Sequence, residues 1–251
     1  MAGYKTLGGG ITQLSDSLQT KYPTSPNGAG QLDPSIWAYG PGWNSSAVTP
    51  VSWPAYQIGA SSIDGLNCFQ WGIGGAAAPS QSLLAVLIPH VLTQGVFGKT
   101  QFVQCTLLQR SGNAGVDQFN GGLTVCQSPA LAQSIAAITV GLYGYDLIIS
   151  SADGTTVLQR AGILADSGNA NLQILGAGTF STGDVVRLSA DLSSPSQVVL
   201  TISRNGTVIA TVTDNSASQI RTGIPGLMCG QVIGTGLAKS EWRNFSAGVG
   251  L

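Results

Sequence analysis

Charged side chains are scarce in this chain of 251 residues, at 8% against about a quarter in an ordinary soluble domain. Lys and Arg total 10 and Asp and Glu total 11, which gives a formal net charge of -1. Binding to nucleic acid or to an anionic membrane needs a strongly basic surface, so this balance excludes both as main functions. Glycine is abundant instead, with 35 residues, and together with many Ser, Thr and Val residues it favours an all-β protein.

Side chains that commonly carry catalysis are also few. The only glutamate is Glu241 and the only histidine is His90. Acid–base and nucleophilic mechanisms draw mostly on His, Glu, Asp, Cys and Lys, and here these types are scattered. The sequence therefore predicts a protein that is not an enzyme.

Long apolar runs are absent as well. The longest, residues 83–91 and 135–143, are too short to cross a bilayer, and residues 1–10 lack the apolar core of a signal peptide. We therefore expect neither membrane insertion nor secretion.

Cysteines are few and far apart, with no C-x-x-C pair among them. Such spacing favours small buried side chains in a reducing cytosol over a disulfide framework or a zinc site. We predict no metal and no cofactor, since no Asp-x-Asp-x-Asp calcium loop is present either. The four are Cys68, Cys105, Cys126 and Cys229.

Two β-hairpins can be recognised from local signals. Residues 198–203 and 208–213 are rich in β-branched side chains and flank Asn205-Gly206, a pair that readily takes the two positive φ angles of a type I′ turn. Residues 147–152 and 156–159 flank Asp153-Gly154 in the same way. The sequence leaves open which face of the first hairpin is buried.

The chain divides into an N-terminal arm and one large domain. Residues 1–30 are rich in Gly, Ser, Thr and Asn, and predict an extended arm, with disorder as the alternative; Ile11, Leu14 and Leu18 offer a short apolar stretch for docking. From residue 31 to residue 251, short apolar segments alternate with turn signals, as in a β-sandwich or jelly roll.

The order of motifs in the second half resembles a known family. A strand opened by Gly-Asp-Val-Val-Arg is followed by the Asn-Gly hairpin, a Gly-Ile-Pro-Gly turn and a last strand ending Phe-Ser-Ala-Gly. In this order the motifs are similar to the closing half of concanavalin A-like, or laminin G-like, jelly rolls of bacterial and bacteriophage proteins. The resemblance implies two antiparallel sheets packed face to face, with a concave face that holds the ligand in sugar-binding relatives. The motifs occupy residues 183–187, 205–206, 223–226 and 245–248.

A glycan-cleaving site of this fold needs two carboxylates, one to protonate the leaving oxygen and one to attack the sugar or activate water. With Glu241 alone, no pair of glutamates is available, and most Asp residues stand beside Gly, Asn or Ser in turns. His90 follows a proline at the end of an apolar run and is more typical of a half-buried structural residue. We therefore assign no catalytic residue.

Sugar binding would rest on the tryptophans of the first half. Trp43 is the best single candidate for stacking on a sugar ring, because it stands in the loop-like context Tyr-Gly-Pro-Gly-Trp-Asn. Trp37, Trp53 and Trp71 are further candidates, although tryptophans at strand ends more commonly cap a sandwich core. Trp242, in the last strand of the resemblance, is expected to be structural.

These observations predict a non-enzymatic structural component of a bacteriophage virion, a capsid decoration protein, head fibre or tail adhesion module. Its partners would be other virion proteins and a host-surface glycan, and low surface charge favours a homo-oligomer, with a trimer as the expected state. Assembly would take place in the host cytoplasm and the final location would be the virion. The alternative is a carbohydrate-binding adhesin or a polysaccharide-cleaving enzyme of the same fold.

Overall fold

The computed structural model describes most of the predicted domain and part of the N-terminal segment. The described residues are 3–7, 10–20, 32–33, 36–39, 43–44, 56–61, 63–71, 83–89, 92, 99–111, 119–127, 143–150, 153–162, 170–231 and 239–250. Within them the regular elements are β-strands, and all paired strands run antiparallel. No helix in the described part has the length and apolar character needed to cross a membrane.

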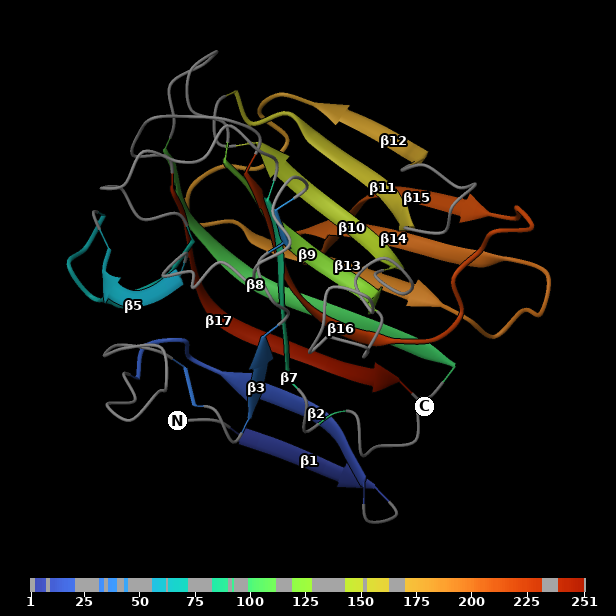
Figure 1. Ribbon diagram of the computed structural model, residues 1–251, viewed down its shortest axis with the longest axis horizontal. Coiled ribbons are helices and arrows are strands. Elements are labelled where there is room, and N and C mark those ends of the chain that lie inside the picture. Colours follow the sequence, from blue (N-terminus) through green and yellow to red (C-terminus); the bar gives the residue numbers. More distant parts are fainter. Residues whose placement is uncertain are drawn as a thin grey trace.

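A nine-stranded sheet is built around the last strand of the chain (Figure 1). Its order is β1-β2-β17-β8-β13-β14-β15, and a further hairpin, β5–β6, joins it because β6 also pairs with β17. The strands are β1 (Gly3–Leu7), β2 (Gly10–Asp16), β5 (Tyr56–Ala60), β6 (Asn67–Trp71), β8 (Thr100–Ser111), β13 (Val185–Asp191), β14 (Val198–Arg204), β15 (Thr207–Asp214) and β17 (Lys239–Gly250).

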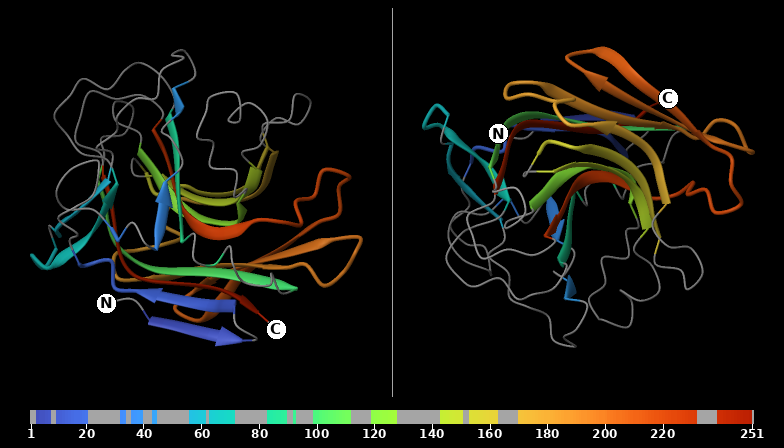
Figure 2. Two further views of the ribbon diagram at one scale, coloured as in Figure 1. Left: turned by 60° about the horizontal axis from the view of Figure 1, so that its bottom comes forward. Right: turned by 90° about the horizontal axis from the view of Figure 1, so that it is seen from above.

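An eight-stranded sheet packs against the first, in the order β12-β11-β10-β9-β16-β7-β3, with β4 also paired to β7. Figure 2 shows this sheet strongly bent, with its hollow side turned away from the nine-stranded sheet. The strands are β3 (Trp37–Tyr39), β4 (Trp43–Asn44), β7 (Leu83–Pro89), β9 (Phe119–Gln127), β10 (Tyr143–Ser150), β11 (Thr156–Gly162), β12 (Ala170–Gly176) and β16 (Ile224–Gln231).

The core lies between the two sheets and is formed by alternate residues of their strands. From Val185 to Ala190 in β13 and from Val198 to Ile202 in β14, buried inward positions alternate with half-buried outward ones, as expected of a sheet with one face in a core. This answers the question left open by the sequence, because Val198, Leu200 and Ile202 form the buried face of the first hairpin. The predicted all-β antiparallel sandwich is confirmed.

Both predicted hairpins are confirmed. Asn205 and Gly206 have φ angles of 51° and 82°, the two positive values of a type I′ turn between β14 and β15. The second hairpin joins β10 to β11, and Gly154 at its turn has a φ of 76°.

The first twenty residues differ from the predicted extended arm. Residues 3–7 and 10–16 pair as β1 and β2, and β2 also pairs with β17, so these strands are part of the nine-stranded sheet. Leu14 and Leu18 are fully buried, because their side chains complete the core beside the last strand. Residues 21–30 of the predicted arm lie outside the described residues.

Three cysteines, Cys68, Cys105 and Cys126, are buried free thiols, so the prediction of small buried side chains is confirmed for them. Burial raises the pKa of the Cys126 thiol to about 12, which keeps it protonated and unreactive. The side chain of Cys229 lies outside the described residues.

Candidate functional site

The alternation along β10 identifies the side chains on the concave face. Tyr145, Leu147 and Ile149 belong to the core between the sheets. Because neighbouring residues of a strand point to opposite faces, Asp146 must point to the hollow side of the eight-stranded sheet (Figure 2). A carboxylate thus stands near the middle of the concave face.

Strand register places further polar residues beside this carboxylate. Asp146 is paired with Thr124 of β9 on one side and with Gln159 of β11 on the other. Gln159 is in turn paired with Asn171 of the edge strand β12. The four side chains form a transverse polar row, which we call the concave row: Thr124, Asp146, Gln159 and Asn171.

Exposure increases along the concave row. Thr124 is fully buried and Asp146 is 2% exposed, whereas Gln159 is half-buried and Asn171 is exposed. The row therefore leads from the open edge of the sheet to a buried carboxyl group.

The environment of Asp146 favours its protonated form. Burial raises the pKa of this carboxyl from 3.8 to about 6, against the opposing effect of hydrogen bonds with the Thr124 and Gln159 side chains. Its Oδ1 has no hydrogen-bond partner within the described part of the chain. A buried carboxyl that keeps its proton at mildly acidic pH and has a free oxygen can act as a general acid.

A β-bulge at the end of β9 adds Gln127 beside Thr124 of the concave row. Cys126 has a φ of 55°, unusual for a residue with a side chain, and the pairing of β9 with β16 shifts register there. The bulge turns Gln127 to the concave side, where its Oε1 lies 3.3 Å from the Thr124 hydroxyl. Gly144 leaves the room for this contact, since a Cβ there would lie 2.8 Å from Gln127 Oε1.

The bulge is held from the other sheet by Gln101 of β8. The Cys126 N–H donates to Gln101 Oε1 at 3.0 Å, and Gln101 Nε2 donates to the Gly223 carbonyl at 2.9 Å. Gln101 is only 1% exposed, so these bonds are shielded from water. One buried amide thereby fixes the two backbone segments that carry the bulge.

Glu241 lies elsewhere. It is on β17 next to Trp242, and because Trp242 is in the core, Glu241 points to the outer side of the nine-stranded sheet. There it is fully buried and accepts hydrogen bonds from Ser61 Oγ at 2.7 Å and from Gln70 Nε2 at 3.1 Å. These contacts join β17 to the β5–β6 hairpin, so Glu241 cannot serve as the second carboxylate of the concave row.

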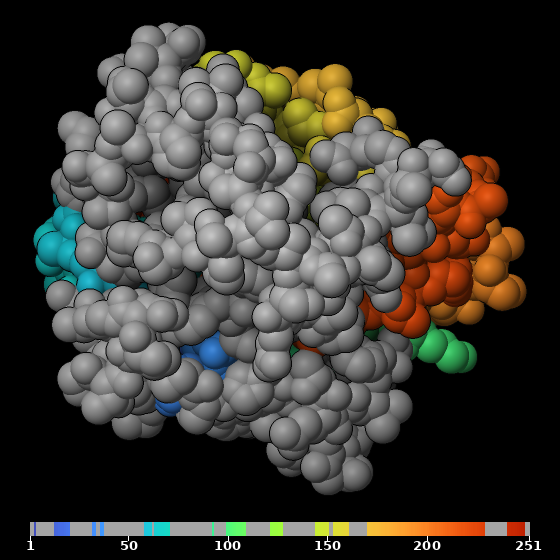
Figure 3. Space-filling model, in the orientation of Figure 1, coloured from blue at the N-terminus to red at the C-terminus, as the bar shows by residue number. Residues whose placement is uncertain are grey.

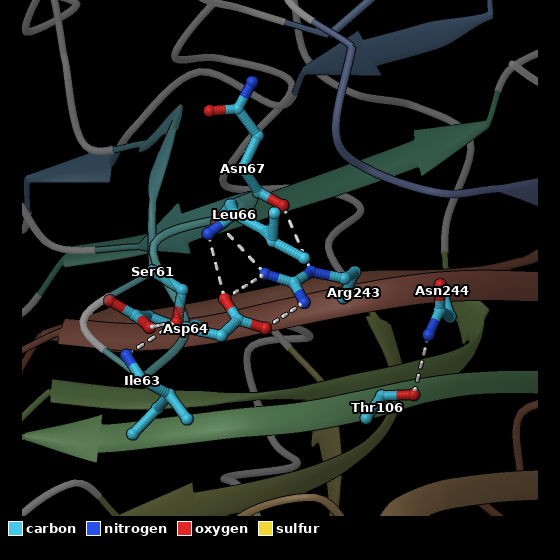
Figure 4. Close-up of polar contacts among 9 residues, drawn as sticks. Ser61, Ile63, Asp64, Leu66, Asn67, Thr106, Arg243 and Asn244 are labelled. Carbon is cyan, nitrogen blue, oxygen red and sulfur yellow. Dashed lines mark hydrogen bonds and ion pairs between the residues drawn. The ribbon is translucent and has the colours of Figure 1, made fainter.

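An ion pair beside Glu241 completes this attachment (Figure 4). Arg243 binds both carboxylate oxygens of Asp64, at 2.8 and 3.0 Å, and also donates to the carbonyls of Leu66 and Asn67. The Arg243 hydrogen bond lowers the pKa of Asp64 to about 2. Every contact serves to hold the loop before β6 on β17, which is a structural role.

The candidate tryptophans are placed as follows. Trp37 is 2% exposed, its Nε1 donates to Asp16 at 2.9 Å, and its ring packs edge-on against Phe245, so it leaves no free ring face for a sugar. Trp43 is in β4 and Trp71 in β6, but their side chains lie outside the described residues, as does Trp53 altogether. Sugar stacking by these three stays a prediction. Trp242 is fully buried, as expected.

Sequence reasoning missed the concave row. It treated Asp residues as turn formers, whereas Asp146 stands within Tyr-Gly-Tyr-Asp-Leu-Ile-Ile, where period-two alternation puts it opposite the apolar side chains. No signal distinguished Thr124, Gln127 or Gln159. His90 lies outside the described residues, and no group of three His, Cys, Asp or Glu side chains suited to a metal occurs within them.

Comparison with known proteins identifies the fold but no family. No family model and no curated protein matches the chain. Solved structures do. A β-1,3-1,4-glucanase (lichenase) from a mouse hindgut metagenome has 10% identity and a TM-score of 0.54, with 96% of this chain and 100% of that chain covered. A Bacillus licheniformis β-glucanase has 9% identity and a TM-score of 0.52, with 98% and 100% covered.

A third similar structure is the GlcNAcα1-4Gal-releasing endo-β-galactosidase of Clostridium perfringens. It has 12% identity and a TM-score of 0.53, and the match covers 93% of this chain and 61% of that chain. At these identities the likeness shows the fold alone, a concanavalin A-like jelly roll, which confirms the fold expected from the resemblance.

The prediction of a non-enzymatic bacteriophage structural component is wrong. The three similar structures are named as enzymes that act on glycans, and none is named as a viral protein. The prediction rested on a count of catalytic residue types, and that count could not reveal the buried carboxyl on the concave face. The expected virion location and homo-oligomer stay predictions.

Proposed function

We propose that this protein binds a polysaccharide along the concave face of the eight-stranded sheet and cleaves a glycosidic bond there, with Asp146 as proton donor. The observation that carries the proposal is the buried Asp146 carboxyl, with its raised pKa and its unpartnered Oδ1, on the concave face of a jelly roll. The enzymes named above share this fold and act on glycans, which supports the same class of substrate.

The chemistry follows from the protonation state of Asp146. Its O–H transfers the proton to the glycosidic oxygen as the bond from that oxygen to the anomeric carbon breaks, so the leaving sugar departs as a neutral alcohol. Asp146 is left as a carboxylate. Gln159 and Asn171, which follow it toward the open edge, are placed to hydrogen-bond sugar hydroxyls.

Hydrolysis also needs a second group that attacks the anomeric carbon or activates water. Two aspartates are close in sequence to the strands that flank β10. Asp117 stands two residues before β9, and Asp166 stands four residues after β11. Both are candidates by chain position, and their side chains lie outside the described residues.

Binding without cleavage is the second candidate function. It is favoured by the observation that Asp146 is the one carboxyl on the concave face within the described residues. A lectin-like site would use the same polar row for recognition only.

Purified protein should be tested on mixed-linkage β-glucan, laminarin and a β-galactan, with new reducing ends as the readout of cleavage and gel retardation as the readout of binding. Asp146→Asn, Asp117→Asn and Asp166→Asn are compared with Asp191→Asn. Asp191 is an exposed aspartate whose carboxylate accepts the Ser193 N–H in a turn.

Reducing ends that are lost in Asp146→Asn and kept in Asp191→Asn would support cleavage. Binding without reducing ends would favour the lectin-like function. If no glycan is bound or cut by the wild type, the concave face does not have this function.

A further inference from the structure

One side of the sandwich ends in two edge strands that carry neither lysine nor proline. β15 is the last strand of the nine-stranded sheet and β12 the last of the eight-stranded sheet. The two strands contact each other, so both edges lie on the same side of the molecule (Figure 1). An edge strand has backbone N–H and C=O groups free to pair with another strand.

No charged residue or proline in these strands opposes such pairing. Proteins commonly protect an edge with lysine or proline. β12 has the sequence ANLQILG, and residues 207–213 of β15 have the sequence TVIATVT, so both stretches are uncharged. Asp214, which follows, is only 3% exposed and is bound by Arg160. The opposite edge of the nine-stranded sheet, β1, carries Lys5.

Apolar side chains surround this edge. Val208 is 57% exposed, Ile209 38% and Ile174 of β12 60%, which makes them three of the five most exposed large apolar residues in the described part of the chain. Ala210 and Val212 are only partly buried, although they pack on the core. Gold and orange-red surface from these segments is visible in Figure 3. Apolar side chains are thus exposed along this edge.

The sequence of β15 fits a second copy of itself. TVIATVT reads nearly the same in both directions about Ala210, so that Thr207 corresponds to Thr213 and Val208 to Val212. In an antiparallel pair related by a two-fold axis, each strand presents the same residues to the other, and opposed Thr and β-branched pairs stabilise a sheet. We propose that two copies of this chain form a dimer by antiparallel pairing of their β15 strands about a two-fold axis near Ala210.

A β-bulge in β15 bears on this geometry. Ile202 pairs with Ala210 and Ser203 with Val208, so Ile209 is the extra residue. The bulge lies next to the turn and leaves Ala210 to Asp214 in regular register with β14. Pairing about Ala210 sets residues 207–209 of each strand, which include the bulge, opposite residues 211–213 of the other, so Val208 and Ile209 become covered. A two-fold pairing also closes on itself, which prevents open-ended association through β15.

The test is the molar mass of the full chain, measured by sedimentation velocity over a wide range of concentration. The wild type should pass from the monomer mass of 25.6 kDa to twice that value. Thr211→Lys and Val208→Lys place a lysine on the edge strand, and each should weaken dimerisation by about tenfold or more, because edge lysines disfavour pairing with another strand.

Ile63→Lys is the matched control, since Ile63 is 53% exposed in the loop between β5 and β6 and should leave the dimer unchanged. Melting temperatures of all variants establish that they are folded. A wild type that stays monomeric at every concentration, a trimer, or a dimer that both edge lysines leave intact would each overturn the proposal. None of these results depends on activity toward a glycan.

Discussion

At the scale of single residues, Asp146 makes the stability of the protein depend on pH. Its pKa is about 6 in the folded protein and 3.8 when exposed, so the folded state keeps a proton that the unfolded state loses. Stability should therefore fall as pH rises from about 4 to about 6, by on the order of 3 kcal/mol, and should change no further above that range on account of this group.

Asp146→Asn should remove this dependence, because an amide does not ionise. The measurement is urea unfolding of wild type and variant between pH 4 and pH 7. The unfolding free energy of the variant should increase relative to that of the wild type as pH rises. Asp191→Asn is the control, since the pKa of Asp191 is lowered by its bonds with Ser193 and its contribution has the opposite sign. Parallel curves for wild type and Asp146→Asn would contradict the raised pKa.

Gln101 should matter through the bulge that it holds. Gln101→Leu leaves the Cys126 N–H and the Gly223 carbonyl without their partner in a buried place, at a cost of about 2–5 kcal/mol of unfolding free energy. Gln104→Leu, on the outward side of the same strand, is the comparison and should have a small effect. Equal stability of the two variants would show that the bulge does not need Gln101.

How far the site could be predicted also depends on single residues. The period-two pattern around Asp146 was visible in the sequence and could have identified a carboxylate on a sheet face. Its partners could not be found, because Thr124 and Gln159 become neighbours only through the pairing of β9, β10 and β11. Gln127 joins them through a bulge, which has no signal in the sequence near Cys126.

At the scale of elements, local turns were predictable and distant pairings were not. Asn205 and Gly206 specify their hairpin by their own backbone preferences. The N-terminal segment was misjudged because the partner of β2 is at the other end of the chain, as the contact between Gln13 and Ser246 shows with its separation of 233 residues. The amino-acid composition of residues 1–30 does not indicate that β2 pairs with the last strand of the chain.

The docking of β2 can be tested at Leu14, which is fully buried and paired with Ala247. Leu14→Ala should lower the unfolding free energy by about 2–5 kcal/mol, because it leaves a cavity in the core. Ser15→Ala, at the next and exposed position, should change it by less than about 0.5 kcal/mol. An unchanged unfolding free energy in Leu14→Ala would mean that the N-terminal segment is a free arm and does not contribute to the core.

At the scale of the whole molecule, composition predicted the fold class correctly and the function wrongly. Few charges and many Gly and Thr residues predicted an all-β protein, and the two sheets confirm that prediction. Function at the proposed site depends instead on where one carboxyl is placed. A single Asp146 changes no average over 251 residues, yet burial on the concave face raises its pKa to about 6, whereas the pKa values of Asp184 and Asp191 are lowered.

The topology also makes the last strand decisive for folding. β17 lies between β2 and β8 and pairs with β6 as well, so three earlier segments depend on it. Its side chains Trp242, Phe245 and Ala247 are buried in the core. Removal of residues 239–251 should therefore abolish cooperative unfolding, as followed by circular dichroism in urea, because β2 and β6 lose their sheet partner and the core loses the side chains of β17.

The control is removal of residues 1–9, which takes away β1, an edge strand that pairs with β2 alone. This truncated chain should keep one sharp transition. A sharp transition in the chain without β17 would mean that β8, β13 and β14 and the eight-stranded sheet form a stable unit by themselves, and that the closing strand is dispensable for the core.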